Sequence, residues 1–185
     1  MERKQNKMKL HKDCKIELAA SKEDSRYVLT EPYLDMSKDP VLVATSGAAI
    51  AVIPVEVCAE DIPGHVGVDA LKLMRKSKRD QAVLTKDWID VEGVGRVLRS
   101  DLGKFPNWRA VVPDKDREVT FAVGLNIKML WELCQAIGCE TARLEFKDNL
   151  EGVLVKPTSV HSPHYASKPC ANENAYGVIM PTRLS

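Results

Sequence analysis

Apolar residues at alternate positions, separated by short polar stretches, predict that most of this chain is antiparallel sheet. Gly47 marks a turn, and Pro54 predicts an edge or a bulge because proline cannot donate to a strand ladder. Residues 1–14 are polar and basic, and we expect a flexible lead-in there. The alternating runs of the first part are Lys15–Ala19, Arg26–Leu29, Val41–Thr45 and Ile50–Ile53.

Two segments have apolar residues three and four positions apart, which is typical of a helix that packs one face on a sheet. Asp69 is the expected N-cap of the first helix, and Asn126 is that of the second. Gly138 is expected to end the second helix. The apolar positions are Ala70, Leu71, Leu73 and Met74 in the first helix and Ile127, Leu130, Trp131, Cys134 and Ile137 in the second.

The two helices belong to an internal repeat, in which each copy has a strand, a helix and further strands. Val-Gly-Val-Asp-Ala-Leu-Lys-Leu at 66–73 aligns with Val-Gly-Leu-Asn-Ile-Lys-Met-Leu at 123–130. Since such a unit cannot cover its own sheet, it should pack against its copy. The predicted fold class is therefore α+β and sheet-rich, with the helices on one side. The strands expected after the helices are Ala82–Thr85, Trp88–Val91, Gly95–Arg99, Arg143–Phe146, Gly152–Val155 and Tyr176–Met180.

Composition adds limits on location and partners. The formal net charge of the 185 residues is +1, so only the placement of the charges can indicate a nucleic-acid partner. The chain has five cysteines, no apolar leader at its N-terminus and no run approaching the roughly 18 apolar residues of a membrane span. We expect a reduced, cytoplasmic protein with no membrane partner.

No group of residues has the spacing of a catalytic or metal site. His11 with Cys14, and His161 with His164 and Cys170, have ligand-like spacing but lack paired Cys-x-x-Cys motifs. Cys134 is expected in the core, and residues 93–95, Gly-Val-Gly, fit a turn or bulge. We expect no catalytic residue, metal or cofactor. Trp88, Trp108 and Trp131 are interpreted as core or junction residues.

Four segments of the chain resemble one protein family, in the family's order. Val-Ala-Thr-Ser-Gly-Ala-Ala-Ile-Ala-Val at 43–52 resembles the Ala-Thr-Asp-Gly-His-Arg-Leu-Ala stretch of the bacterial DNA sliding clamp, the beta subunit of DNA polymerase III. Gly-Lys-Phe-Pro-Asn-Trp-Arg-Ala-Val-Val-Pro at 103–113 is similar to its Phe-Pro-Asp-Tyr-Arg-Arg-Val-Leu-Pro. Residues 121–133 resemble the strand and helix opening its last half-domain. Tyr-Gly-Val-Ile-Met-Pro-Thr-Arg-Leu at 176–184 resembles its C-terminal Tyr-Val-Val-Met-Pro-Met-Arg-Leu.

The resemblance implies a shortened clamp, about half of a full chain. Residues 15–113 would hold strands like those of the middle domain and the first repeat unit, and 114–185 the second unit, like the C-terminal half of the last domain. The family's first domain, the middle domain's first strand and helix, and the first half of the last domain have no counterpart. Since the chain supplies few of the helices that line the family's ring, we expect a homo-oligomer.

The resemblance also implies a pocket for short extended peptides, which the family forms between its middle and last domains. Apolar walls with Met and Pro suit aliphatic or aromatic anchors. Ala48 and Ala49 replace the family's His-Arg pair and Thr182 replaces a Met, so we expect a different peptide specificity. The residues carried over by position are Thr45, Gly47, Ala48, Ala49, Ile50, Pro113, Val178, Met180, Pro181, Thr182, Arg183 and Leu184.

Cations on the first helix form the candidate surface for DNA. The segment has no acid between Ala70 and Arg79, so it could neutralise phosphates without reading sequence. A solvated helix face would carry the same charges and remains an alternative. The second helix offers a further cation but also Glu132 and Gln135. The candidate DNA-binding residues are Lys72, Arg75, Lys76, Lys78, Arg79 and Lys128.

Two functions follow from these observations. The first is a clamp-like processivity factor of DNA replication, an oligomer that binds double-stranded DNA non-specifically and recruits polymerase or repair proteins carrying clamp-binding peptides. The second is a non-encircling module that captures such peptides as an adaptor or competitor. Neither function is enzymatic.

Overall fold

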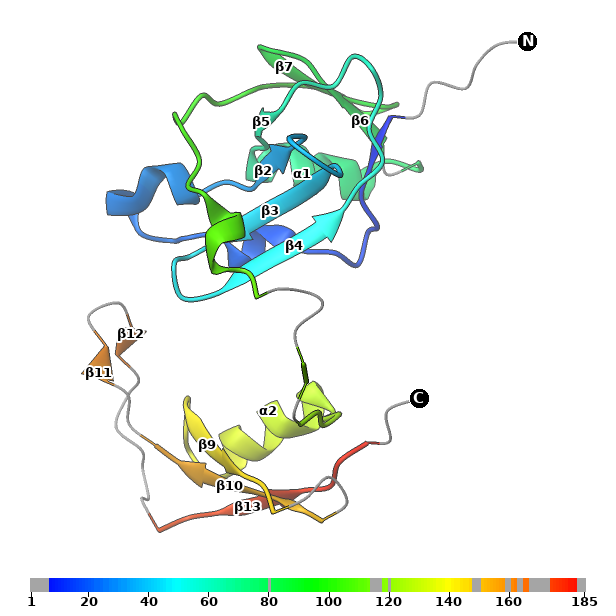
Figure 1. Ribbon diagram of the computed structural model, residues 1–185. Helices are drawn as coiled ribbons and strands as arrows, with labels where there is room; N and C mark the ends of the chain where they lie inside the picture. Colours follow the sequence, from blue (N-terminus) through cyan, green and yellow to red (C-terminus); the bar gives the residue numbers. More distant parts are fainter. Residues whose placement is uncertain are drawn as a thin grey trace. The chain divides into compact units, whose positions relative to one another are not determined.

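The described residues of the computed structural model are 7–79, 81–113, 118–119, 121–147, 151–158, 161–162, 165–166 and 174–182. They form two compact units, Met1–Ala110 and Val111–Ser185, each with its own apolar core (Figure 1). None of the described helices has the length and apolar character needed to cross a membrane.

One sheet of the first unit contains β2 (Tyr33–Asp35), β3 (Val41–Thr45), β4 (Ile50–Pro54) and β5 (Gly64–His65), in the order β4-β3-β2-β5. All its pairings are antiparallel. β4 lies at the edge, as its proline predicts. The short strands β2 and β5 were not predicted from the sequence.

The second sheet of this unit contains β1 (Met8–Lys9), β6 (Gln81–Leu84), β7 (Trp88–Val91) and β8 (Gly95–Leu98), in that order. Ala82 pairs with Val91 and Leu84 with Ile89, which places all four apolar side chains on the buried face. Helix α1 (Val68–Lys76) packs on β7 and β8.

A single apolar cluster joins α1 to both sheets of the first unit. It includes Leu34 and Leu42 from one sheet, Leu84 from the other, and Leu71 from α1, each completely buried. Met8 also lies in this cluster with no exposed surface. The expectation of a flexible lead-in at 1–14 is therefore wrong for 7–14, because β1 completes a sheet there, and 1–6 lie outside the described residues.

Two predicted strands of the first unit are instead 3₁₀ helices, η1 (Ile16–Ala19) and η2 (Asp24–Leu29). In η1, Ile16 is 3% exposed while Leu18 is 69% exposed. Because a 3₁₀ helix has about three residues per turn, Ile16 and Ala19 share the face that packs on the core. The apolar positions in 15–19 thus fit a period of three as well as a period of two, and the structure has the period of three.

The second unit has a three-stranded sheet in the order β13-β10-β9, with helix α2 (Ile127–Ala136) packed against it. Its strands are β9 (Ala142–Glu145), β10 (Val153–Pro157) and β13 (Gly177–Ile179). The short strands β11 (His161–Ser162) and β12 (Tyr165–Ala166) form a separate pair. The core consists of Val153, Val155 and Ile179 together with residues of α2.

Both ends of α2 agree with the sequence prediction. Asn126 is the N-cap, and its side chain accepts a hydrogen bond from the Met129 amide at 3.1 Å. Beyond the helix, Gly138 has φ 71° and its amide donates to Gln135, while the Cys139 amide donates to Cys134. This pair of bonds is a Schellman motif, which a glycine allows without strain.

The N-cap predicted for α1 is wrong. The helix begins at Val68 with Gly67 as its N-cap, and Asp69 lies in the first turn. The carboxylate of Asp69 is still favourably placed near the positive end of the helix dipole. In both units the helix is followed by three strands of one antiparallel sheet, β6-β7-β8 in the first and β9-β10-β13 in the second, as the repeat predicts. In the second unit the pair β11-β12 lies between β10 and β13 in the sequence, and a single bridge at Gly124 stands where the repeat predicts a strand before the helix. The packing of one copy on the other stays a prediction.

Replacement of Met8 by Ala tests whether β1 belongs to the core. Because the side chain is completely buried, Met8→Ala should lower the free energy of unfolding by about 2–5 kcal/mol. Urea denaturation followed by circular dichroism measures this change. Lys9→Ala is the matched control, since its side chain in the same strand is exposed. Equal stabilities of the two variants would show that the segment is not part of the core.

Candidate peptide and nucleic-acid surfaces

The turn between β3 and β4 carries the first set of residues that the resemblance assigns to a peptide pocket. Thr45 Oγ1 donates to the Ala49 carbonyl at 2.8 Å and accepts from the Gly47 amide at 3.0 Å. Arg26 Nη1 donates to the Ser46 carbonyl at 2.7 Å. These bonds fix the backbone of the turn and leave its tip, residues 47–49, exposed.

Gly47 is required in this turn for two reasons. Its φ is 87°, which side-chain-bearing residues rarely adopt, and a Cβ there would lie 2.7 Å from Arg26 Nη1. Ile50 follows the tip and packs with Val41 and Val43 in a small apolar cluster. Residues 45 and 50 are thus half-buried supports, and only 47–49 can contact a partner through their full surface.

The segment that resembles the family's junction packs on the sheet of its own unit. Phe105 is 7% exposed and its ring stacks on Tyr33 at 5.0 Å between centroids. Trp108 Nε1 donates to Asp35 Oδ2 at 2.8 Å, and Arg109 forms an ion pair with the same oxygen. The Arg109 guanidinium also lies 4.2 Å from the centre of the Trp108 ring. Trp108 is therefore a packing residue, as the sequence predicts.

The carboxyl of Asp35 holds this segment in place. Burial would raise its pKa, but hydrogen bonds from Ser37 and Trp108 and the charge of Arg109 together hold the pKa below its ordinary value. The ionised form is therefore the one that the folded protein stabilises.

The second set of peptide residues lies in the second unit. Tyr176, Val178 and Met180 are 68%, 55% and 62% exposed, and they alternate with the buried Gly177 and Ile179. We call these three side chains the β13 surface. They are on the side of the sheet opposite to the core, and β13 is an edge strand of that sheet.

Gly152, which directly precedes the neighbouring strand β10, leaves room for two side chains of the β13 surface. A Cβ at Gly152 would lie 2.6 Å from Val178 Cγ1 and 3.3 Å from Met180 Sδ. Val178 also lies opposite Leu154 of β10, so the apolar surface extends onto that strand. The arrangement offers apolar contact to a ligand along two strands.

The remaining peptide residues have mixed positions. Pro113 is exposed in the second unit, and Pro181 is half-buried. The Thr182 amide donates to the Gly124 carbonyl at 2.9 Å, so its backbone is already used within the unit. Arg183 and Leu184 lie outside the described residues.

The basic segment of the first unit differs from the single helix face expected from the sequence. Because α1 ends at Lys76, Lys78 and Arg79 lie in the following turn. Arg75 forms a half-buried ion pair with Glu17, which joins α1 to η1. This cation is a structural group and not an open phosphate contact.

Other cations of the segment also have acidic partners. Lys72 Nζ lies 3.3 Å from Asp69 Oδ1, and Arg79 pairs with Glu92, which also binds Lys7 at 3.1 Å. Lys76 and Lys78 are exposed, and neither makes a salt bridge within the part of the chain that the structure describes. These two lysines are the open cations of the segment.

Helix α2 presents an apolar outer face. Ile127 is 72% exposed, and Met129 and Trp131 are each 56% exposed. The interpretation of Ile127 and Trp131 as packed residues is wrong, because Leu130, Leu133, Cys134 and Ile137 already complete the row that faces the sheet. Lys128 lies 3.8 Å from Glu132, so this helix adds little positive charge.

Trp88 is also exposed, at 41%, with the Arg96 guanidinium 5.6 Å from its ring centre, which corrects its interpretation as a core residue. Among the described residues, no group of His, Cys, Asp and Glu could hold a metal ion. His164 and Cys170 lie outside the described residues.

No protein-family model and no curated protein matches this sequence. The structure is similar to bacterial sliding clamps. It aligns over 100% of this chain and 54% of the DnaN sliding clamp from Bartonella birtlesii bound to griselimycin, with a TM-score of 0.63 and 17% identity. The DNA polymerase III beta chain from Streptococcus pneumoniae aligns over 99% and 51%, with a TM-score of 0.61 and 17% identity.

The DNA polymerase sliding clamp from Bacillus subtilis aligns over 90% of this chain and 45% of that one, with a TM-score of 0.58 and 13% identity. The chain therefore has the fold of the bacterial sliding clamp, which confirms the fold class predicted from the sequence. The chain spans about half the length of the clamp chains that its fold matches.

The pKa of Asp35 predicts a specific dependence of stability on pH. A lowered pKa contributes stability that is present above the unfolded value of about 3.9 and is lost as the pH falls through the folded value. Asp35→Asn should therefore lower the free energy of unfolding by about 1–3 kcal/mol at pH 7, and by less below about pH 4. Urea denaturation at several pH values measures both. Asp39→Asn is the control, because Asp39 is exposed. A loss that did not depend on pH would contradict the role of the charge.

Proposed function

We propose that this protein is a clamp-like accessory protein of DNA replication or repair, which acts by binding partner proteins and not by catalysis. The clamp fold over the whole chain supports the class of protein. The exposed apolar β13 surface is the observation that favours binding of a partner. The proteins of similar fold are DNA polymerase sliding clamps, so the partners proposed are polymerase or repair proteins that carry clamp-binding peptides.

The proposed ligand is a short extended peptide with aliphatic or aromatic anchors. Tyr176, Val178 and Met180 offer apolar contact, and the thioether of Met180 adapts to anchors of different shape. Because β13 is an edge strand, its outer backbone groups can pair with an added strand. Side chains would then provide specificity and the backbone would provide a sequence-independent share of the affinity.

The turn of the first unit is proposed, by itself, as a contact surface for clamp-binding peptides. Gly47, Ala48 and Ala49 are exposed and carry no charge, so they can contact a peptide without desolvating an ion. The roles of Pro113, Pro181, Thr182, Arg183 and Leu184 stay predictions from the resemblance. An oligomeric state and the reduced, cytoplasmic setting expected from the composition also stay predictions.

Binding of a fluorescent clamp-binding peptide, followed by anisotropy, tests the proposed function. The double change Val178→Thr and Met180→Gln removes apolar contact and keeps side-chain size. It should weaken binding at least about tenfold, equal to about 1.4 kcal/mol. Val94→Thr, at an exposed valine between β7 and β8, is the matched control and should bind normally. Absence of binding to the unaltered protein, or equal affinity of both variants, would overturn the proposal.

Non-specific binding of double-stranded DNA is a second candidate function. The open lysines Lys76 and Lys78, together with Lys72, are the observation that favours it. Phosphate contacts of this kind give affinity that falls steeply with salt and does not depend on sequence. Arg75 and Arg79 are less suited to it, because their acidic partners Glu17 and Glu92 are half-buried, whereas the partner of Lys72, Asp69, is exposed and holds that lysine only weakly. Lys128 belongs to the second unit and lies beside Glu132.

The salt dependence of DNA binding tests this second function. Replacement of Lys72, Lys76 and Lys78 by Gln should reduce the slope of log K against log salt by about 0.9 for each phosphate that the variant no longer neutralises. Replacement of Lys22, Lys38 and Lys104, which are also exposed, removes the same charge elsewhere and should leave most of the slope. Equal slopes for the two variants would exclude a DNA site on α1.

Light scattering of the protein alone, over a range of concentrations, determines whether a discrete oligomer forms.

A further inference from the structure

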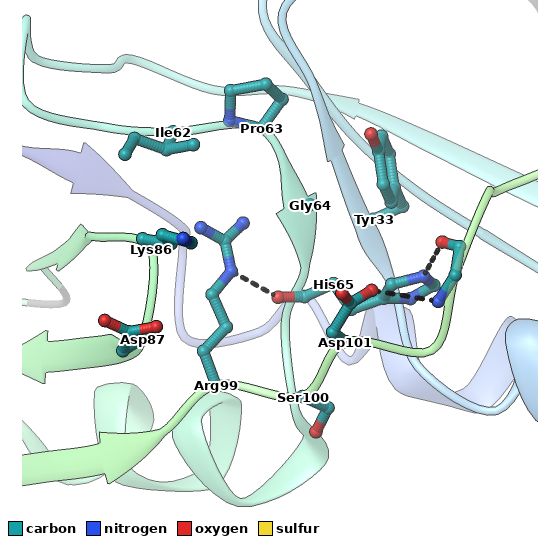
Figure 2. Close-up of a pocket in the computed structure, with 11 residues that line it drawn as sticks. Tyr33, Ile62, Pro63, Gly64, His65, Lys86, Asp87, Arg99, Ser100 and Asp101 are labelled. Carbon is teal, nitrogen blue, oxygen red and sulfur yellow. Dashed lines mark hydrogen bonds between the residues drawn. The ribbon is translucent and has the colours of Figure 1, made fainter.

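The first unit contains a pocket whose lining residues belong to neither proposed surface. It has a volume of about 310 Å³ and lies between β5 and the segment that follows β8 (Figure 2). Pockets for small ligands have volumes of about 300–1,000 Å³, so this one suits a small molecule or the end of a chain. Tyr33, His65 and Arg99 line its wall, and Lys86, Asp87 and Asp101 are its exposed charged residues.

Arg99 is the unusual group in this pocket. Only 9% of the residue is exposed, although it carries a full positive charge. Its Nε donates to the His65 carbonyl at 2.9 Å and its Nη1 to the Thr85 carbonyl at 2.7 Å. Its Nη2 is buried and has no hydrogen-bond partner. Two backbone contacts therefore anchor the guanidinium and leave one nitrogen available.

No described carboxylate forms an ion pair with Arg99. Asp61 is near enough to act through its charge, but its oxygens accept from the Leu84 amide at 2.8 Å and the Cys58 amide at 2.7 Å. Burial holds the pKa of Arg99 below its ordinary value, and the charge of Asp61 offsets only part of this effect. A buried cation without a paired anion costs several kcal/mol, which a bound anion would offset.

The backbone next to Arg99 is shaped to receive the guanidinium. Gly64 has φ 143°, and a Cβ there would lie 2.7 Å from Arg99 Nη2. Any larger residue would displace this nitrogen. His65 adds a second unpaired polar atom in the same wall, because its Nε2 contacts the Gly103 carbonyl at 3.1 Å while its Nδ1 is buried without a partner.

We propose that this pocket binds a monocarboxylate with a small apolar body, whose carboxylate pairs with Arg99 Nη2. Lys86 at the rim adds attraction, while Asp87 and Asp101 disfavour an anion of higher charge such as phosphate. Ile62 and Pro63 provide apolar contact and lie on the guanidinium side of the pocket in Figure 2. Since Nη2 is buried beside Gly64, binding includes a local shift that opens this nitrogen to the carboxylate. The carboxylate belongs either to a free small acid or to the C-terminus of a peptide.

Titration of the ¹⁵N-labelled full chain with benzoate, followed by NMR, tests the proposal. Benzoate should cause saturable shifts at the amides of Ile62, Gly64 and Ser100, and the neutral analogue benzamide should bind at least about tenfold more weakly. Inorganic phosphate should also bind more weakly than benzoate. A short peptide with an apolar last residue, compared with its C-terminal amide, identifies the source. Tighter binding of the peptide acid than of benzoate indicates that the natural carboxylate is a peptide C-terminus. Tighter binding of benzoate indicates a free small acid. Either result supports the proposal.

Two variants locate the carboxylate. Arg99→Gln should weaken benzoate binding at least about tenfold, provided that its NMR spectrum shows a folded protein. Lys86→Gln changes an exposed residue and should weaken binding about twofold to threefold without disturbing the fold. Lys38→Gln, an exposed lysine outside the pocket, should bind normally. The proposal is overturned if benzoate causes no saturable shifts, if benzamide or phosphate binds as tightly as benzoate, or if Lys86→Gln and Lys38→Gln behave alike.

Discussion

The shared apolar core of the first unit is the constraint on which its surfaces depend. Leu34 and Leu42 from one sheet, Leu84 and Ile89 from the other, and Leu71 from α1 are completely buried in one cluster. A shift of any strand by one residue would turn its apolar side chains toward water. The turn after β3, the basic end of α1 and the Arg99 pocket all lie at the ends of these elements, so the same packing fixes them.

Charged residues play different roles around this core. Asp35 binds Trp108 and Arg109, and so attaches the segment after β8 to the sheet that contains β2. Arg75 joins α1 to η1 through Glu17. These pairs orient elements, and removal of one partner would leave the other charge half-buried. The net charge of the sequence contains none of this information, because it counts a cation in a structural pair and an open cation in the same way.

Much of the fold can be predicted from the sequence, because long periodic segments leave few alternatives. The strands β3, β4, β6 to β10 and β13 and both helices follow from their apolar spacing. The two-residue and three-residue strands β1, β2 and β5 are too short for a periodic signal, so only tertiary pairing reveals them. The alternation at Lys15–Ala19 fits a strand and a 3₁₀ turn equally well, and packing on β3 and β4 decides between them.

The candidate sites were less predictable, since exposure depends on which neighbours cover a residue. Spacing alone puts Trp131 beside Leu130 on the packed side of α2, yet the residues that pack on the sheet are Leu130, Leu133, Cys134 and Ile137, and Trp131 stays 56% exposed. Arg99 gives no signal in the sequence, because an arginine after a strand is ordinary. Its significance comes from the two carbonyls that hold it and from the absence of an acid at its third nitrogen among the described residues.

Exposed apolar side chains indicate a binding surface more strongly than exposed cations do. A lysine in water is already well solvated, so Lys76 and Lys78 need no partner to explain them. The three side chains of the β13 surface leave apolar area in water, and its burial would yield about 25 cal/mol for each Å². Their position on an edge strand adds open backbone groups to that apolar area. Partner capture by the second unit therefore has a stronger physical basis than DNA binding by the first.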